Sequence, residues 1–238
     1  MTDPSPSLAA LTQRYQSVKQ RIQNACLQAN RPIGSVALLA VSKTKPIKQI
    51  NVLAQYGQVC FGENYLQESL TKIAQCPELE WHFIGPIQSN KTKAIAEHFQ
   101  WVHSVDRLKV AQRLSRQRPS EVPPLNILLE VNISEEETKA GLTPSEVLQV
   151  AAEIATLPNL KLRGLMAIPQ KQTNIEAQRL PFRQVRELLE QLNTQHPEWK
   201  LDTLSMGMSG DLEAAIMEGA TLVRIGTDIF GAREDRSN

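Results

Sequence analysis

The apolar run Val36–Val41, VALLAV, followed by Ser42 and Lys43, sets the pattern of the whole chain. A short run without a polar residue is typical of a strand buried on both faces, as strands in parallel sheets are. The polar residues that follow, and Pro46 after them, indicate the end of a strand and the entry to a helix. This stretch therefore predicts one strand–loop–helix unit.

Similar units recur along the chain. The predicted strands are Val36–Val41, Val59–Phe61, Trp81–Ile84, Trp101–Val102, Ile127–Val131, Leu162–Ala167, Leu204–Met206 and Leu222–Ile225. Thr143 and Glu146 form a capping box around Pro144, and Asp106 is a predicted N-cap. The predicted helices are Leu8–Ala29, Arg107–Gln117, Pro144–Ala155, Glu176–Gln195 and Asp211–Met217.

Strands that alternate with helices predict an α/β fold with a parallel sheet. Eight such units in 238 residues favour a closed (β/α)8 TIM barrel, with an extra N-terminal helix, over an open sheet. No Gly-rich or Ser-rich linker divides the chain, so we expect one domain over residues 8–232. Residues 1–7 and 233–238 are expected to be flexible tails.

Composition excludes several classes of partner. Lysine and arginine total 26, aspartate and glutamate 25, and the net charge is +1. Such a balance gives no electrostatic footprint for nucleic acid or an anionic membrane. No apolar run reaches the roughly 18 residues that crossing a bilayer requires. Three widely spaced cysteines suggest neither a disulfide framework nor a zinc site and indicate a cytoplasmic protein.

The functional site of a (β/α)8 barrel lies at the C-terminal ends of its strands. Lys43 is the one side chain immediately after a predicted strand that can form an imine. Desolvation there would lower the pKa of its amine and make it a nucleophile toward a carbonyl. The alternative is an ordinary solvated lysine. Lys45, beside Pro46, is expected to face solvent.

Two loops after the last two strands suggest a bound phosphate, because barrels often bind phosphate at this position. The first is the segment 205–211, SMGMSGD, and the second begins at Gly226 and Thr227. Glycines let the backbone approach an anion, and a helix start offers N–H donors. The alternative for the first loop is an ordinary turn with a serine N-cap.

Polar residues inside strands need partners in the core. Arg224 lies within the last predicted strand, and an ion pair with Glu130 is one structural explanation. His82 is expected to be a hydrogen-bonded core residue, and Asn64 either an N-cap or a residue of the barrel mouth. His98, His103 and His196 show no clustered partners in the sequence, so no metal site is expected.

Six motifs together resemble the pyridoxal phosphate (PLP) homeostasis family, whose fold matches the N-terminal barrel of alanine racemase. They are AVSKTKP around Lys43, FGENY at 61–65, WHFIGPIQSNK at 81–91, GLMAI at 164–168, SMGMSGDLEAAI at 205–216 and VRIGTDIFG at 223–231. The resemblance implies that Lys43 carries PLP as a Schiff base. It also implies that Ser209, Gly210, Gly226 and Thr227 hold the phosphate, Arg224 faces the pyridine nitrogen, and Asn64 and Met206 line the ring.

The family resemblance implies a role in intracellular PLP (vitamin B6) and amino-acid homeostasis rather than catalysis, with PLP-requiring apoenzymes as possible recipients. A monomer is expected. The first alternative is an amino-acid racemase, which would need a second base such as a tyrosine from a β-rich domain. Only Tyr15, Tyr56 and Tyr65 are present, and little chain follows Gly231. The second alternative is a cofactor-free Schiff-base aldolase acting on a sugar phosphate.

Overall fold

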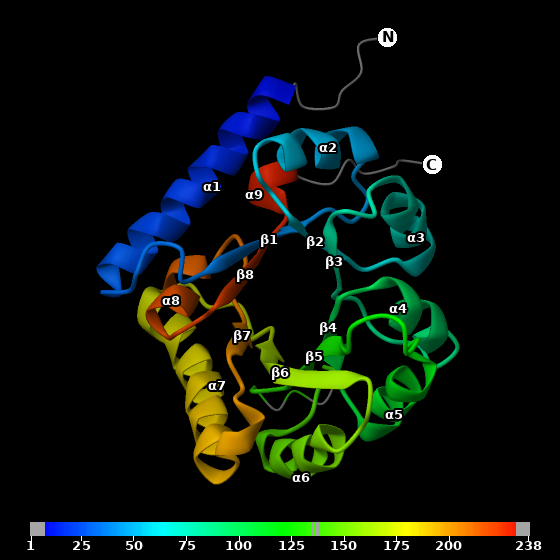
Figure 1. Cartoon of the computed structure of the whole chain (residues 1–238). Helices are drawn as coiled ribbons and strands as arrows, with labels where there is room; N and C mark the ends of the chain where they lie inside the picture. Colours follow the sequence, from blue (N-terminus) through cyan, green and yellow to red (C-terminus); the bar gives the residue numbers. More distant parts are fainter. Residues whose placement is uncertain (1–7, 135, 137–138, 232–238) are drawn as a thin grey trace.

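The computed structural model describes residues 8–134, 136 and 139–231, and both expected tails lie outside this range. Its strands form a closed parallel barrel in which each strand pairs with the next and β8 pairs with β1 (Figure 1). The strands are β1 (Ala37–Val41), β2 (Cys60–Glu63), β3 (Glu80–Phe83), β4 (Trp101–Val105), β5 (Leu125–Val131), β6 (Leu160–Ala167), β7 (Thr203–Ser205) and β8 (Leu222–Ile225). The predicted (β/α)8 barrel is therefore confirmed.

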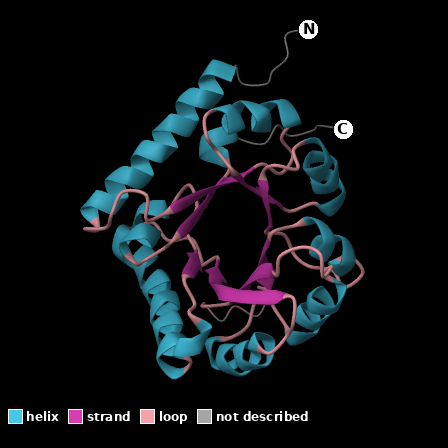
Figure 2. Cartoon of the chain, viewed as in Figure 1, coloured by secondary structure: helices cyan, strands magenta, loops and turns pink. Residues whose placement is uncertain are grey.

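Helices surround the barrel as an outer ring (Figure 2). They are α1 (Leu8–Gln28), α2 (Ile47–Gln55), α3 (Leu66–Gln75), α4 (Thr92–His98), α5 (Leu108–Gln117), α6 (Pro144–Ala155), α7 (Ile175–Gln195), α8 (Leu212–Met217) and α9 (Thr227–Phe230). A short 3-10 turn, Pro197–Trp199, precedes β7. Helix α1 is the predicted extra N-terminal helix, and it buries Leu11, Tyr15 and Val18 against the rest of the fold.

The main apolar core lies between the strands and the helices, where side chains from both layers are fully buried. A separate small cluster of Trp101, Leu128 and Met166 lies apart from it. Such burial of apolar area is the main favourable term for folding. The apolar runs in the sequence marked the strands because their residues contribute to these two clusters.

Two local expectations were wrong. Strand β4 runs to Val105 rather than ending at Val102, because His103 and Ser104 are buried and hydrogen-bonded inside the fold. Asp106 does not cap helix α5. Its carboxylate instead accepts from Arg107 at 2.7 Å, and Arg107 is the N-cap residue. The capping box was correct, since the Glu146 carboxylate accepts the Thr143 backbone N–H at 2.9 Å.

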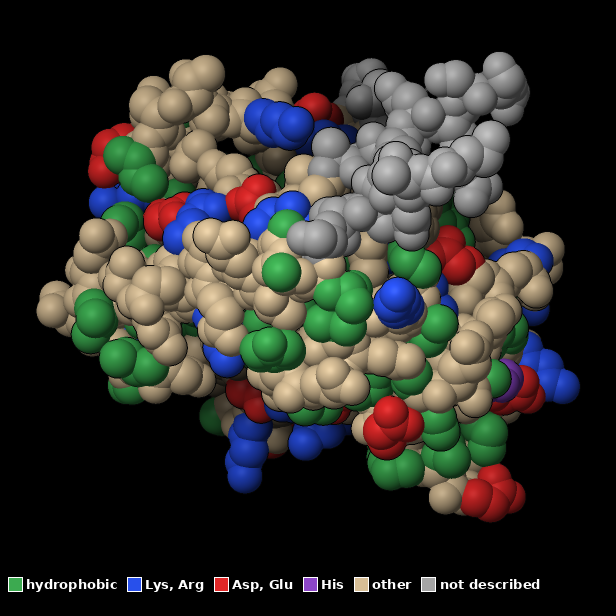
Figure 3. All heavy atoms as spheres, turned by 90° about the horizontal axis from the view of Figure 1, so that it is seen from above, with side chains coloured by type: hydrophobic (Ala, Val, Ile, Leu, Met, Phe, Trp, Pro, Cys, Tyr) green, Lys and Arg blue, Asp and Glu red, His purple; other side chains and the backbone are tan. Residues whose placement is uncertain are grey.

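Charges are distributed without a dominant sign on the face shown in Figure 3, where Lys and Arg side chains are interspersed with Asp and Glu. Cys26, Cys60 and Cys76 form no disulfide. Within the described ranges, no helix has both the length and the apolar character needed to cross a membrane.

Candidate cofactor site at the barrel mouth

A cavity of about 780 Å³ opens among the loops that follow the strands. Its position at the C-terminal ends of the strands is that of ligand sites in (β/α)8 barrels, and its size suits a small molecule. The lining residues are Val41, Lys43, Thr44, Lys45, Asn64, Ile84, Met166, Ile168, Lys171, Gln172, Gln178, Met208, Ser209, Gly210, Asp211, Arg224, Gly226, Thr227 and Gly231.

The structure brings together all but one of the residues expected at the site. Lys43, Asn64, Ser209, Gly210, Arg224, Gly226 and Thr227 line the cavity. Met206 does not, because its backbone N–H continues the sheet by donating to Leu222 and its side chain is fully buried in the main core. Met166 and Met208 line the cavity instead.

Lys43 lies in a tight turn after β1 that buried charges hold in place. On one side, Ser42 Oγ donates to Glu63 Oε1 at 2.6 Å. On the other, the backbone N–H of Thr44 donates to Glu68 at 2.7 Å, and Thr44 adopts a positive φ of 63°. Lys72 joins the two carboxylates, because its Nζ donates to Glu63 at 2.7 Å and to Glu68 at 2.5 Å.

Lys72 Nζ also donates to the backbone carbonyl of Ser42 at 2.8 Å. The side chains of Lys72 and Glu63 are almost wholly buried, at 6% and 0% exposure. Burial raises the pKa of Glu63, although the charge and hydrogen bond of Lys72 oppose the rise. The residues on both sides of Lys43 are thus fixed to one buried ion-pair cluster.

Lys45 was expected to face solvent, but it does not. It is half-buried and lines the cavity, with its Nζ 3.5 Å from the carbonyl oxygen of Phe230. The backbone N–H of Lys45 donates to the Ser42 carbonyl and closes the turn that carries both Lys43 and Lys45. Two lysines from one turn therefore line the cavity.

Asn64 follows β2 and lines the cavity rather than capping α3, whose N-cap residue is Tyr65. Among the residues that the structure describes, its Oδ1 is a buried oxygen without a hydrogen-bond partner, although buried polar groups are nearly always paired. Gly85 lies against it: a Cβ at Gly85 would stand 2.4 Å from the Asn64 carbonyl oxygen. Glycine at position 85 is therefore needed for this placement of Asn64.

The loop after β7 is held in shape by its own backbone. Gly207 has a φ of 94°, and a Cβ there would stand 2.6 Å from the Cβ of Ala215. Its carbonyl accepts the backbone N–H of Arg224 at 2.9 Å. The Met208 N–H donates to Asp211 at 2.6 Å. This compact turn brings Ser209 and Gly210 to the cavity.

Arg21, from α1, ties the loops after β7 and β8 together. Its guanidinium donates to the Ser209 carbonyl at 3.1 Å, to Asp228 at 2.5 Å and to Glu213 at 2.8 and 3.0 Å. The backbone N–H of Asp228 also lies 3.4 Å from Ser209 Oγ. The extra helix thus has a clear role at the site, which the apolar spacing of its sequence did not indicate.

Arg224 extends from β8 into the barrel and is buried. It makes no ion pair with Glu130. Its Nη1 donates to the carbonyl and the hydroxyl of Ser205 at 2.6 and 2.7 Å, and its Nη2 to the Ala167 carbonyl at 3.1 Å. Burial lowers its pKa to about 10, against the charges of Asp211 and Glu130. Neutral oxygens therefore orient a charged guanidinium in the cavity wall.

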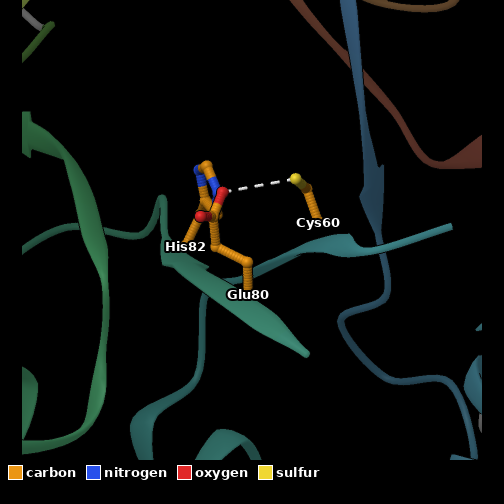
Figure 4. A group of neighbouring side chains, drawn as sticks. All are labelled: Cys60, Glu80 and His82. Carbon is orange, nitrogen blue, oxygen red and sulfur yellow. Dashed lines mark hydrogen bonds and ion pairs between the residues drawn. The ribbon is translucent and has the colours of Figure 1, made fainter. Parts of the chain in front are cut away.

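A second polar cluster lies within the sheet, and the sequence did not indicate it. His82 is a hydrogen-bonded core residue, as expected, with Nε2 2.8 Å from Glu80 and Nδ1 2.8 Å from His103. His103 was wrongly expected to lack a clustered partner. The Cys60 thiol donates to Glu80 at 3.3 Å. Cys60, Glu80 and His82 each offer one atom that could bind a metal ion, and these three atoms lie within 4.8 Å of one another (Figure 4).

The chemistry of the cavity favours an anion that carries a carbonyl group. Lys43, Lys45, Lys171 and Arg224 line it, against the single carboxylate of Asp211 among the described lining residues. A partly desolvated lysine amine is a nucleophile toward carbonyls, and an arginine is a planar cation that never accepts a hydrogen bond. Asn64 Oδ1 adds a buried acceptor. Together, these lysines, the arginine and the asparagine fit the aldehyde, phosphate and ring of PLP.

Known proteins support the same family. Residues 7–234 match the family model "Alanine racemase, N-terminal domain". The pyridoxal phosphate homeostasis protein of Pseudomonas aeruginosa is 55% identical, over 95% of this chain and 97% of its own length. The corresponding protein of Haemophilus influenzae is 54% identical, over 91% of this chain and 93% of its own length.

Solved structures agree with this fold. PipY of Synechococcus elongatus with PLP bound has a TM-score of 0.77 and 36% identity, covering 88% of this chain and 98% of PipY. Alanine racemase of Corynebacterium glutamicum has a TM-score of 0.69 at 17% identity, covering 97% of this chain and 63% of the racemase, which supports the fold alone. The chain therefore belongs to the alanine racemase N-terminal domain family and, within it, to the pyridoxal phosphate homeostasis proteins.

Proposed function

We propose that this protein binds PLP in the cavity at the barrel mouth, as a Schiff base on Lys43, and serves PLP (vitamin B6) and amino-acid homeostasis. One observation carries the proposal: a lysine, a buried arginine and two glycine-containing loops from separate strands converge on one cavity. The printed names of its relatives, and a PLP-bound homologue at 36% identity, support this ligand.

The proposed roles follow the positions of the side chains. Ser209 and Gly210, with Gly226 and Thr227, hold the phosphate through backbone N–H and hydroxyl groups, as loops after the last two strands often do. Arg224 faces the pyridine nitrogen. Met166 and Met208, which line the cavity, are proposed as ring contacts, whereas Met206 is buried in the core.

We propose a carrier rather than an enzyme. When bound, PLP supplies a reactive aldehyde and an electron-withdrawing ring. Arg224 keeps the ring nitrogen unprotonated, because a guanidinium has no acceptor and remains charged. An unprotonated ring withdraws electrons less, whereas enzymes that use this property place an acid at the nitrogen. Lys43 and the charged lining thus hold the cofactor more than they activate it.

The positions of the tyrosines support this distinction from a racemase. Among the described lining residues there is no tyrosine. Tyr15 is a buried residue of α1 whose hydroxyl donates to Gln58 at 3.2 Å, and Tyr56 and Tyr65 are about half exposed. A cofactor-free aldolase would use the same Lys43 and phosphate loops. Identification of the bound ligand, PLP or a sugar phosphate, therefore distinguishes a PLP carrier from an aldolase.

We also propose that the protein acts as a cytoplasmic monomer that passes PLP to apoenzymes. Three cysteines without a disulfide are compatible with a reducing compartment. Light scattering of the holo protein tests the monomer, and activation of an apoenzyme by the holo protein tests the transfer.

Absorption spectroscopy tests the proposed function directly. The protein incubated with PLP should show a visible Schiff-base band that Lys43→Ala removes and Lys45→Ala keeps. A wild-type protein without the band would contradict PLP binding. Exchange of the Cα proton of free amino acids at enzyme-like rates would contradict the carrier. Borohydride trapping of a sugar phosphate on Lys43 would support the aldolase instead.

A further inference from the structure

Five side chains form one continuous hydrogen-bonded chain through the barrel. Glu80 Oε1 lies 2.8 Å from His82 Nε2, and His82 Nδ1 lies 2.8 Å from His103 Nε2. His103 Nδ1 lies 2.9 Å from Ser205 Oγ, which accepts from Arg224 Nη1 at 2.7 Å. The five residues come from β3, β4, β7 and β8, so the chain crosses the interior of the sheet.

The two ends of this hydrogen-bonded series, Arg224 and Glu80, lie at opposite ends of the barrel. Arg224 lines the cavity at the C-terminal ends of the strands. Glu80 is the first residue of β3, and its side chain is 39% exposed. Figure 4 shows this outer end, where the Cys60 thiol also donates to Glu80. Glu80 is therefore remote from the cavity but connected to it.

The chemistry of the end groups allows only one direction of donation when all four bonds form in series. Arg224 can only donate, so Ser205 Oγ accepts from it, and the hydroxyl of Ser205 is left to donate to His103 Nδ1 when that nitrogen carries no proton. His103 then donates from Nε2 to His82 Nδ1, and His82 donates from Nε2 to Glu80. A carboxylate can only accept, so the series ends there. When both histidines are neutral, each therefore carries its proton on Nε2.

The surroundings bury most of this hydrogen-bonded series and hold it in place. His82, His103, Ser205 and Arg224 are all buried. Burial lowers the pKa of both histidines, so that each is neutral. The ring of Trp101 stacks on His82 at 5.3 Å with an angle of 5° between the planes. The hydrogen bonds in such a low-dielectric chain polarise one another.

We propose that Glu80 is a remote positioning residue of the cavity: it sets the direction of the chain through His82, His103 and Ser205, and so fixes the orientation and charge distribution of Arg224. With a carboxylate at the far end, Ser205 presents its lone pairs to Arg224. Without that charge, the reverse direction becomes accessible, and Ser205 then has to accept from His103 as well. The effect on PLP rests on the function proposed above, but the effect on Arg224 does not.

Nitrogen NMR of the cofactor-free protein tests this inference. In the wild type, His82 and His103 should both be the Nε2–H tautomer at neutral pH. Glu80→Gln should add the Nδ1–H form and shift the Arg224 guanidinium signals, and Ser205→Ala should abolish that shift. An Nδ1–H or doubly protonated histidine in the wild type would overturn the inference. So would Arg224 signals that ignore Glu80→Gln.

Cofactor binding gives the second readout, with Glu198→Gln as the matched control. Glu198 is an exposed carboxylate that pairs with His196 at 3.1 Å outside the chain of five. Glu80→Gln should raise the Kd for PLP about twofold to thirtyfold, the range for coupling through a packed network, and shift its absorption band. Glu198→Gln should do neither, and Glu80→Asp should stay near the wild type.

A double-mutant cycle separates the chain from simple field effects. If the Glu80→Gln effect disappears in the Ser205→Ala background, the chain carries it. If it persists there, the charge acts through space and the inference is wrong. A wild-type protein that binds no PLP would contradict the proposed function alone, and the NMR spectra of the cofactor-free protein would still decide the role of Glu80.

Discussion

Lys72→Met tests whether the buried ion-pair cluster holds the turn of Lys43. Lys72 is almost fully buried and donates to Glu63, Glu68 and the Ser42 carbonyl at 2.5–2.8 Å. Methionine has a similar length and keeps the apolar packing, but removes the charge and all three bonds. The variant leaves a buried Glu63 without its cation.

Removing one partner of a buried pair typically costs about 3–5 kcal/mol, because the other charge is left uncompensated. Glu63 is 0% exposed, so water cannot replace the lysine. Within the described part of the chain, Glu63 Oε2 already has no hydrogen-bond partner, which leaves Ser42 Oγ as the remaining donor to this carboxylate. We therefore expect Lys72→Met to lower the free energy of unfolding by a value within that range at neutral pH.

The stability lost in Lys72→Met should change with pH in one direction. The pKa of Glu63 is raised above its ordinary value of 4.5, mainly by burial. Its contribution to stability is therefore greatest below that value and falls as pH rises through the folded-state pKa. Lys72 opposes the rise, so Lys72→Met raises this pKa further. The destabilisation should be full above the new pKa and shrink as the pH falls below it.

Urea unfolding at several pH values provides the assay. Lys93→Met is the control, because the side chain of Lys93 is 72% exposed and lies 3.7 Å from Glu97, so its loss should cost less than about 1 kcal/mol. Adding Glu63→Gln to Lys72→Met should recover most of the loss. A cost for Lys72→Met equal to that of Lys93→Met, or one that grows in acid, would refute the reasoning.

Three further outcomes are expected. Arg21→Ala should weaken PLP binding about tenfold, the cost of losing a charged hydrogen bond, because it frees the loop of Ser209; titration with PLP measures this. Gly85→Ala should cost about 1–3 kcal/mol in thermal or urea unfolding, because its Cβ would clash with Asn64. Burial raises the pKa of Glu218, but hydrogen bonds from arginines of α7 outweigh it and hold the pKa below its ordinary value. Its stabilisation is thus present above that value and lost as pH falls through the folded-state pKa, so Glu218→Gln should flatten the acid limb of stability.

Each of these variants has a control or a contradicting result. Arg113→Ala removes an arginine that bonds Thr92 far from the cavity, and it should leave PLP affinity unchanged. Gly210→Ala should leave stability within about 0.5 kcal/mol, since no atom of the described residues lies within 4 Å of the new Cβ. An Arg21→Ala protein with wild-type affinity, or a Glu218→Gln protein with an unchanged acid limb, would contradict the stated contacts.

The sequence was sufficient for the barrel because apolar runs mark strands that are buried on both faces. It placed β8 at Leu222–Ile225 without error and most other strands within two or three residues. It failed at β4, where His103 and Ser104 look like a loop. Polar residues are stable within a strand when partners from neighbouring strands satisfy them, and a single sequence does not show those partners.

Residues that line the cavity could be predicted where they lie at strand ends, as Lys43 and Gly226 do. Contacts that join distant segments of the chain were missed. Arg21 lies more than 180 residues before Ser209, and no local spacing relates the two. The contact between His82 and His103 could have been predicted from the sequence. The two histidines lie in adjacent predicted strands or directly after them, so both side chains can reach the interior of the barrel close to each other.

Mass spectrometry of the borohydride-reduced holo protein tests most directly whether Lys43 carries the cofactor. Reduction makes the bond between PLP and its lysine permanent, and proteolysis then locates the modified residue. Lys43, Lys45 and Lys171 all line the cavity, so the site of modification discriminates among them. The modification is expected on Lys43 alone. A modification on Lys45 or Lys171, or a protein that remains unmodified, would contradict the proposed site.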